Sequence, residues 1–578
     1  MKAVLAAVNA KYIHSNLAVY CLKAYAQTRG ERVALKEYTI NQNPEEILRD
    51  LYLEKPDVLA LSCYIWNISV IREIGAELHK LLPELSIWVG GPEVSYDAER
   101  FLGDNSWASG IMRGEGEITF TELLGRIREG QTLHGLKGIT WRSKDGEIIV
   151  NEDRPVMALS EVPFPYSELN EFAHRIIYYE SSRGCPFSCS YCLSSIDKKL
   201  RFRDLSLVFR ELQFFLDHRV PQVKFVDRTF NCLHDHAKAI WRYLLEHDNG
   251  VTNFHFEVAA DLLDEEELEL IAAMRPGLIQ LEIGVQSTNR DTITEIHRKM
   301  DFSQVSAIVR RIKQGHNVHQ HLDLIAGLPF EDLESFRRSF NDVFALQPDQ
   351  LQLGFLKVLK GSFMYQRAKT YDCVYREKEP YEVLFTRWLS YDDVLRLKRV
   401  EEMVEVYYNS AQFTHTLPVC MERFSDAFSF FDSLGCFYEE NGYFSVAHTR
   451  IRRYEILQEF MAEYTGEEEQ EKCREWMVFD LYLRENMKTR PSWARDLSDW
   501  KSAFREFYRQ EEENRKYLSE LVGRDARQLA KMTHLEVFTH IFEKETMVLF
   551  SYESRDPLSH SARWQIIEGS RYETRQDI

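Results

Sequence analysis

The sequence lacks any run of roughly 18 or more apolar residues, so it predicts no membrane-spanning helix. It also lacks an excess of basic side chains, because 72 lysines and arginines stand against 91 aspartates and glutamates, for a net charge of −19. Nucleic acids are bound through basic clusters, so this balance argues against a nucleic-acid partner and favours a small molecule or a peptide. The ten cysteines form no secreted disulfide pattern, and the first residues carry no signal cleavage pattern. Together these absences predict a protein of the cytoplasm.

At 578 residues the chain is too long for one hydrophobic core, and its patterning divides it into four regions. Their expected bounds are residues 1–135, 136–175, 176–365 and 366–578. The second region holds a predicted hairpin, Gly138–Ser143 with Glu147–Asn151, followed by a stiff, extended linker that contains two prolines.

Short apolar runs alternate with amphipathic segments in residues 1–135, which predicts an α/β fold with a doubly wound parallel sheet. The expected strands are Lys2–Val8, Val33–Tyr38, Asp57–Ser62, Ile87–Val89 and Gly110–Met112. The expected helices are Ser15–Gln27, Pro44–Leu53, Ser69–Leu82 and Ile118–Arg128. Ligands of such sheets bind at the carboxyl ends of the strands, where this chain has His14, Gly90-Gly91-Pro92 and Gly114-Glu115-Gly116-Glu117.

Three cysteines, Cys185, Cys189 and Cys192, follow a strand-like run at C-x3-C-x2-C spacing. Thiolates are the preferred ligands of iron–sulfur clusters, and three of them leave one iron of a cubane open to another molecule. The alternative is a zinc site, which usually takes four ligands. No histidine or cysteine follows at zinc-like spacing, and the next cysteine is Cys232.

With Tyr191 as its aromatic residue, this C-x3-C-x-aromatic-C motif resembles the signature of the radical S-adenosylmethionine (SAM) superfamily. The resemblance implies a [4Fe–4S] cluster on Cys185, Cys189 and Cys192 that binds SAM and cleaves it to a 5′-deoxyadenosyl radical. It also implies an electron donor such as flavodoxin or ferredoxin. The two glycine-rich loops of the first region resemble those of the cobalamin-binding domain that precedes many radical SAM domains.

The resemblance implies a flavodoxin- or Rossmann-like cobalamin-type domain at residues 1–135, with Gly90, Gly91 and Glu115 at the corrin. The cobalamin fingerprint D-x-H-x-x-G is absent, so no histidine below cobalt is indicated. His14 is then either a group that faces the corrin or an ordinary loop residue, and a degenerate domain without cobalamin stays open.

Residues 176–365 hold six strand–helix units, which matches the partial (β/α)6 barrel of the superfamily. The expected strands are Ile176–Ser181, Val223–Val226, Phe254–Ala259, Leu278–Val285, His321–Ala326 and Gln350–Val358. Chemistry in such barrels sits at the carboxyl ends of the strands. The resemblance places Tyr191, Asp227 and Glu257 among the cofactor-binding residues, with Asp227 at the SAM ammonium or the substrate. It also suggests Gln286 or Ser287 at the ribose and Ile325 and Gly327 at the adenine, although the family's G-x-I-x-G-x-x-E pattern is only partly met.

Three further features allow two interpretations each. Arg201-Phe202-Arg203 and His297-Arg298-Lys299 bind a carboxylate or substrate, or form surface salt bridges. Cys232 carries a proton or hydrogen atom, or is a plain loop cysteine.

Residues 366–578 predict a mainly helical domain. The expected helices are Tyr391–Tyr408, Ser425–Leu434, Arg450–Tyr464, Cys473–Glu485 and Trp500–Glu513, and the expected strands are Val537–Phe542 and Thr546–Ser551. Asp480-Leu481-Tyr482-Leu483 and Arg490-Pro491-Ser492-Trp493 resemble a domain of unknown function that is appended to cobalamin-type radical SAM proteins. We expect this domain to cover the barrel mouth and to help select the substrate.

The reaction that the resemblance favours is methyl transfer to an unactivated carbon of a small molecule or peptide. The alternatives are a cyclisation or rearrangement, or a non-catalytic sensor that uses cobalamin or a cluster as its signal. Methylthiotransferases normally carry a second set of three cysteines in the N-terminal domain. Because that region holds only Cys21 and Cys63, the sequence argues against them.

Overall fold

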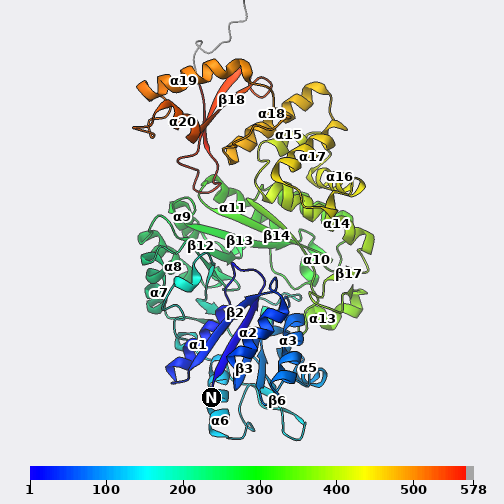
Figure 1. Cartoon of the computed structure of the whole chain (residues 1–578). Helices are drawn as coiled ribbons and strands as arrows, with labels where there is room; N and C mark the ends of the chain where they lie inside the picture. The colour runs from blue at the N-terminus through cyan, green and yellow to red at the C-terminus, as the bar shows by residue number, and fades with distance from the viewer. Residues whose placement is uncertain (568–578) are drawn as a thin grey trace, which may run out of the picture. The chain divides into compact units, whose positions relative to one another are not determined.

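The computed structural model describes residues 1–567, which form two compact units (Figure 1). The first unit is Met1–Ser339 with Leu353–Val394. The second is Phe340–Gln352 with the described residues from Leu395 onward. None of the helices within residues 1–567 has both the length and the apolar character that crossing a bilayer requires.

The first unit begins with a seven-stranded sheet in the order β2-β1-β3-β4-β5-β6-β7. The strands are β1 (Ala3–Asn9), β2 (Val33–Thr39), β3 (Val58–Ser62), β4 (Ser86–Gly90), β5 (Gly110–Met112), β6 (Ile139–Arg142) and β7 (Ile148–Val150). The first five are parallel, as predicted, and each lies within two residues of its expected bounds. The hairpin β6–β7, which the sequence suggested as part of a connection, instead extends this sheet in antiparallel fashion.

Helices cover both faces of this sheet because successive strand residues point to opposite sides. Val4, Ala6 and Val8 of β1 belong to one apolar cluster, and Ala3 and Leu5 belong to another. The helices are α1 (Leu17–Thr28), α2 (Pro44–Glu54), α3 (Ile68–Leu81), α4 (Pro92–Ser95), α5 (Ala98–Asp104) and α6 (Glu117–Glu129). The short helices α4 and α5 were not predicted. The doubly wound arrangement places the loops after β1, β3, β4 and β5 at one edge of the sheet.

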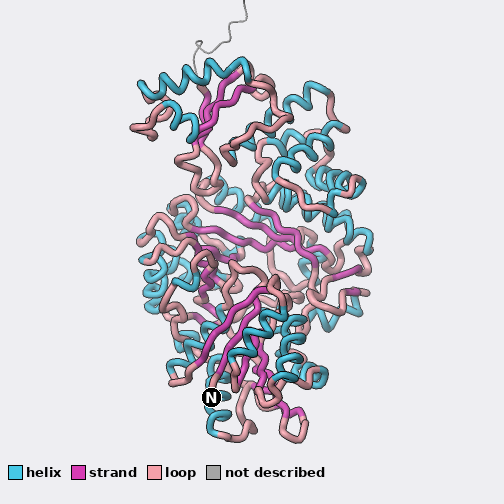
Figure 2. The backbone as a smooth tube through the Cα atoms, viewed as in Figure 1, coloured by secondary structure: helices cyan, strands magenta, loops and turns pink. Residues whose placement is uncertain are grey.

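A second, six-stranded sheet follows in the order β15-β14-β13-β12-β11-β8 (magenta in Figure 2). Its strands are β8 (Ile177–Tyr179), β11 (Gln222–Phe225), β12 (Asn253–Val258), β13 (Ile279–Gln286), β14 (His319–Ala326) and β15 (Gln350–Phe355). The helices between them are α7 (Leu205–Asp217), α8 (His234–Glu246), α9 (Glu265–Ala273), α10 (Arg290–Glu295), α11 (Phe302–Gln314) and α12 (Leu333–Phe344). All six predicted strands are present, and this arrangement is the expected partial barrel.

Burial alternates strictly along β13 and β14. Leu281 and Ile283 of β13 are fully buried, whereas the intervening Glu282 and Gly284 are only partly buried. Phe256 of β12 packs against Trp241 of α8, so the fully buried side chains of the strands face the helices. The alternate, polar residues therefore line the inside of the barrel.

The first unit ends with α13 (Phe363–Arg367) and the short strand pair β16 (Val374–Tyr375) and β17 (Val383–Phe385). Tyr381 Oη donates a hydrogen bond to Glu93 at the start of α4, and Lys360 Nζ lies 3.5 Å from Glu93 Oε1. The segment after the barrel is therefore anchored to a loop of the N-terminal sheet.

The second unit is mainly helical, as predicted. Its helices are α14 (Tyr391–Met403, which begins in the first unit and continues as a π-helix over Val404–Asn409), α15 (Thr416–Met421), α16 (Ala427–Glu440), α17 (Arg450–Ala462), α18 (Glu467–Arg484), α19 (Lys501–Asn514) and α20 (Ala526–Met532). Of the expected strand pair, β19 (Thr546–Ser551) has its predicted bounds, whereas β18 (Thr533–Phe538) begins four residues before the predicted Val537–Phe542. An unpredicted third strand, β20 (Arg563–Ile566), extends this sheet.

Candidate active site

The cysteine loop begins directly after β8 and is held in place by its own backbone. Gly184 has a φ of +91°, and a Cβ there would lie 2.7 Å from the carbonyl oxygen of Lys199, so only glycine fits. Cys185 N donates to Asp197 O at 3.1 Å, and the strand pair β9 (Ser182–Arg183) and β10 (Arg201–Phe202) closes the loop. Lys198 Nζ donates to the carbonyl of Phe187 within the loop. The chain thus fixes the loop without help from a ligand.

The three thiols of the motif are free, with Cys185 and Cys189 buried and Cys192 partly buried. Tetrahedral zinc with Zn–S bonds of about 2.3 Å would bring its sulfur ligands to about 3.8 Å from one another. Among the described residues, these thiols do not form one of the groups whose ligand atoms all lie within 4.8 Å. This wider spacing fits a cubane cluster better than a single ion.

Arg298, which the sequence suggested as a surface or substrate-binding residue, reaches the cysteine loop. Its Nη1 lies 3.9 Å from Cys189 Sγ and 3.4 Å from Tyr191 Oη, and its Nη2 donates to the carbonyl of Gly284. Its Nε is buried and has no hydrogen-bond partner. A guanidinium in this position would offset negative charge on a thiolate-bound cluster.

The carboxylate of Asp227 at the end of β11 is occupied by the chain itself. Its Oδ1 accepts hydrogen bonds from Ser181 N (2.8 Å) and Ser182 N (2.9 Å), and its Oδ2 accepts one from Ser181 Oγ. Burial raises the pKa of Asp227 to about 7. The side chain is 1% exposed and braces the segment that leads to Cys185. A role at the SAM ammonium stays a prediction.

The other residues predicted to bind a cofactor lie at the ends of β13 and β14 and in the cysteine loop. Ser287 is fully buried and donates to Glu331 Oε1 at 2.6 Å, so its hydroxyl serves a network at the end of β13. Gln286 has a φ of +73°, and its buried Oε1 lacks a hydrogen-bond partner. Tyr191 and Ile325 both pack against one apolar cluster, and their contact with a cofactor stays a prediction. Gly327, with a φ of +87°, would place a Cβ 2.8 Å from Val383, so the fold itself accounts for this glycine.

The inside of the barrel is charged, and most of these charged residues lie within the strands and not at the predicted strand ends. Burial disfavours ionisation of Glu282, yet hydrogen bonds from His255 and Lys224 hold its pKa at about 2. His321 Nε2 lies 3.0 Å from Asp323 Oδ1 on β14. Glu257 on β12 has a pKa raised to about 7, mainly by burial and then by the charge of Glu282. The signal in the sequence was a polar residue at most of the alternate positions of β12, β13 and β14.

A cavity of about 1070 Å³ lies between the edge of the N-terminal sheet and the barrel, both within the first unit. This volume exceeds the range of roughly 300–1,000 Å³ that is usual for drug-sized ligands. Its wall includes the predicted residues Gly90, Gly91, Glu115 and His14, together with Tyr178 of β8. His14 Nδ1 lies 2.6 Å from Tyr178 Oη, and burial lowers the pKa of the imidazole. The loop after β1 is therefore attached to the first barrel strand.

Glu115 and its neighbours connect this cavity to the cysteine loop. Arg183 of β9, two positions before Cys185, forms ion pairs with Glu117 (2.6 Å) and Glu115 (3.5 Å). Burial opposes ionisation of Glu115, but Arg183 and Arg201, the latter at 2.5 Å, hold its pKa below the usual range. Arg203 is buried in an ion pair with Glu211 at 2.6 Å. Arg201 and Arg203 thus form salt bridges, one of the two roles expected for them.

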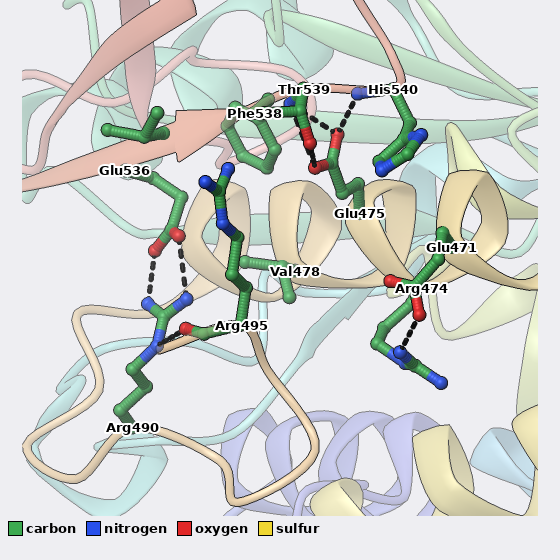
Figure 3. Close-up of a pocket in the computed structure, with 11 residues that line it drawn as sticks. Glu471, Arg474, Glu475, Val478, Arg490, Arg495, Glu536, Phe538, Thr539 and His540 are labelled. Atoms are coloured by element: carbon green, nitrogen blue, oxygen red, sulfur yellow. Dashed lines mark hydrogen bonds and ion pairs between the residues drawn. The ribbon is translucent and has the colours of Figure 1, made fainter. Parts of the chain in front are cut away.

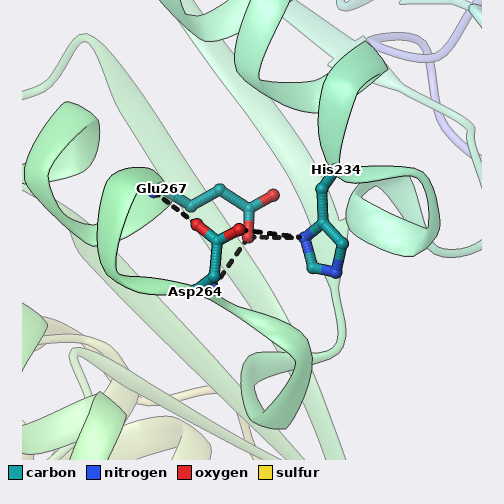
Figure 4. A group of neighbouring side chains, drawn as sticks. All are labelled: His234, Asp264 and Glu267. Atoms are coloured by element: carbon teal, nitrogen blue, oxygen red, sulfur yellow. Dashed lines mark hydrogen bonds and ion pairs between the residues drawn. The ribbon is translucent and has the colours of Figure 1, made fainter.

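Two other groups in the described chain do not form comparable sites. A cavity of about 320 Å³ in the second unit is lined by charged residues of α18, β18 and the loop after α18. Several of them pair with one another, such as Arg490 of that loop with Glu536 of β18 at 2.5 and 2.7 Å (Figure 3). His234, Asp264 and Glu267 bring their ligand atoms together (Figure 4). Asp264 and Glu267 form the capping box of α9, and Lys238 Nζ lies 2.6 Å from Asp264 Oδ2. The ammonium group of Lys238 therefore already provides a positive charge beside these carboxylates.

Comparison with protein families finds three matches along the chain. Residues 3–124 match the B12 binding domain, residues 179–343 match the radical SAM superfamily, and residues 369–550 match a protein family of unknown function, DUF4080. The cavity wall from the N-terminal sheet lies in the first match, and the cysteine loop and the barrel strands β11 to β14 lie in the second.

Among curated proteins, the chain is 27% identical to the cobalamin-dependent radical SAM methyltransferase TokK of Streptomyces tokunonensis, over 55% of this chain and 49% of that protein. It is 29% identical to the uncharacterized methyltransferase PH0819 of Pyrococcus horikoshii, over 54% and 69%. It is 22% identical to the anaerobic magnesium-protoporphyrin IX monomethyl ester cyclase of Rubrivivax gelatinosus, over 54% and 58%. The chain thus spans about half the length of TokK.

Among solved structures, the chain resembles that of OxsB, a cobalamin-dependent SAM radical enzyme, with aqua-cobalamin and SAM bound. The TM-score is 0.58 at 16% identity, over 83% of this chain and 79% of that one. At this identity the likeness supports the fold.

Proposed function

We propose that this chain, which matches the B12 binding domain, the radical SAM superfamily and DUF4080, is a cobalamin-dependent radical SAM enzyme that cleaves SAM reductively and methylates an unactivated carbon. The substrate is a small molecule or a peptide, and the electron comes from a donor such as flavodoxin or ferredoxin. When bound, the cluster with SAM supplies a carbon-centred radical, and cobalamin supplies a carrier for the methyl group. The reduced thiols of the cluster loop favour the cytoplasm as the compartment.

One observation carries this proposal: the ion pairs of Arg183 and Arg201 join the cysteine loop to the wall of the large cavity. Arg183 lies two residues before Cys185 and pairs with Glu115 and Glu117, whose loop lines the cavity. A molecule bound at the cysteines and a molecule bound in the cavity would therefore share one wall. A substrate between them would meet both.

The residues of this chain have separate tasks in the proposal. Cys185, Cys189 and Cys192 hold the cluster, and Arg298 places positive charge beside Cys189. Tyr191 and Ile325 offer the apolar surface for the adenosyl group. The cavity wall, with Gly90 and Gly91 among its residues, would contact the corrinoid.

The proposal is tested by profiling a strain that lacks this chain while it is fed methyl-labelled methionine. We expect one labelled compound to disappear and its unmethylated precursor to accumulate. A missing product that never carried the label would favour the second candidate, ring formation or rearrangement, which the likeness to the magnesium-protoporphyrin cyclase supports.

A non-catalytic sensor is separated from both enzymes by SAM turnover. A sensor need not produce 5′-deoxyadenosine when the reconstituted protein is reduced, whereas either enzyme must.

A further inference from the structure

Four arginines line the large cavity, and one of them has no partner. Three are ion-paired: Arg113 with Asp153 (3.1 Å), Arg154 with Glu122 (2.5 Å) and Arg183 with Glu117 (2.6 Å). Within residues 1–567, the guanidinium of Arg228 makes no ion pair or hydrogen bond, although it belongs to the same wall. Within the part of the chain that the structure describes, the cavity therefore presents one guanidinium without an ion pair or hydrogen bond.

The backbone of Arg228 is fixed on both sides. The preceding Asp227 is held by Ser181 and Ser182, and the hydroxyl of the following Thr229 donates to the carbonyl of Arg228 itself at 2.7 Å. Arg228 therefore stands at the carboxyl end of β11, directly beside the cysteine loop. Arg228 itself is exposed, and its fixed backbone keeps the guanidinium at the wall of the cavity.

Two other elements face this guanidinium. Arg228 is one of the cations that oppose the rise in the pKa of Glu257 on β12, which burial raises to about 7. It acts in the same way on Tyr64, in the loop after β3, whose pKa burial raises to about 12. Arg228 thus lies between the barrel mouth and the N-terminal sheet, in the region where a substrate would meet both cofactors.

A guanidinium is a planar fork of donors that matches the two oxygens of a carboxylate or phosphate. The cysteine loop has its own cation in Arg298, at 3.9 Å from Cys189 Sγ, and this cation is available to a group bound beside the cluster. We propose that Arg228 binds a carboxylate or phosphate of the substrate. The substrate class is then an oxyanion-bearing molecule, an inference that rests on the proposed function.

The test is equilibrium dialysis of radiolabelled inorganic phosphate against the full chain loaded with cluster and cobalamin. We expect saturable binding that Arg228→Gln weakens about tenfold or more, because a charge-assisted hydrogen bond is lost. Arg228→Lys should weaken binding less, since it keeps the charge and loses the fork. The matched control is Arg310→Gln, which removes an exposed arginine on α11, outside the barrel. Equal binding by wild type and Arg228→Gln would overturn the proposal.

SAM and cobalamin also carry oxyanions, so two further measurements on Arg228→Gln separate the sources. A raised SAM requirement for 5′-deoxyadenosine formation without substrate would assign Arg228 to the SAM carboxylate and overturn the proposal. Loss of hydroxocobalamin retention would assign it to the corrinoid phosphate, with the same consequence. Unchanged values for both, with weakened phosphate binding, support the substrate. Failure of the proposed function itself would appear in the wild type, as absent SAM cleavage or absent corrinoid, and leaves the phosphate result readable.

Discussion

Asp227 is the residue for which sequence and structure suggest different tasks, and substitution separates them. In the structure its carboxylate accepts hydrogen bonds from Ser181 N, Ser182 N and Ser181 Oγ, and it is 1% exposed. These donors lie three and four residues before Cys185. If the carboxylate is a brace, its acceptor oxygens matter more than its charge.

The size of the effect follows from the donors that each substitution leaves unpaired. Asp227→Ala leaves two buried backbone N–H groups without an acceptor, each at a cost of about 1–3 kcal/mol. We therefore expect a loss of about 2–6 kcal/mol in the free energy of unfolding. Asp227→Asn keeps one oxygen that can accept from both amides, so we expect a loss of about 1 kcal/mol. The alanine variant should also incorporate less iron, because the cysteine loop loses its support.

The assay is urea unfolding of the cluster-free protein, followed by an iron determination after anaerobic reconstitution. Wild-type stability and iron content in Asp227→Ala would refute the brace. A full-iron Asp227→Asn with a strongly raised SAM requirement would restore the role at the SAM ammonium.

Two further predictions concern a buried acid and a crowded glycine. Glu331 has a pKa raised by burial from 4.5 to about 7, so the folded state binds more protons in this window. The protonated Glu331 contributes about 3 kcal/mol to the free energy of unfolding; this contribution is full below about pH 4.5 and is lost as the pH rises through 7. In urea unfolding of the cluster-free protein, Glu331→Gln should reduce the fall of the free energy of unfolding over this pH range. An unchanged fall would contradict the assignment. Gly91 has a φ of +119° with a Cβ position 2.4 Å from Cys63 O, so Gly91→Ala should destabilise the protein by about 3 kcal/mol and reduce hydroxocobalamin retention. The control Gly103→Ala in α5, where a Cβ meets nothing within 4 Å, should be neutral or stabilising, and equal behaviour of both variants would count against the crowding argument.

The strands of both sheets were predictable because a buried parallel strand is a continuous or alternating apolar run in the sequence. The attachment of the hairpin β6–β7 was not, because its partner β5 is chosen by tertiary packing around Gly110 and Trp88. A local pattern contains no information about such a partner.

The cysteine motif could be recognised in the sequence because its spacing is local. The position of Arg298 beside this motif could not be predicted. Arg298 comes more than 100 residues after Cys189 and reaches it only because β13 and α10 return the chain to the mouth of the barrel. Ser287 shows the converse: its place at a strand end suggested a ligand contact, and its hydroxyl bonds to Glu331 instead. Side-chain direction at a strand end depends on neighbours that the sequence does not reveal.

The central claim is that Cys185, Cys189 and Cys192, and no fourth cysteine, hold a cluster that cleaves SAM. The most direct measurement is 5′-deoxyadenosine production by the anaerobically reconstituted, reduced protein, with Cys189→Ala compared with Cys232→Ala. Cys232 is the matched control because it lies outside the motif but close enough to Cys185 that the charge of Cys185 contributes to raising the pKa of Cys232. The account predicts about four irons per chain and product formation in the wild type and in Cys232→Ala, and no product from Cys189→Ala. Wild-type product from Cys189→Ala, or its loss in a folded Cys232→Ala, would contradict the account.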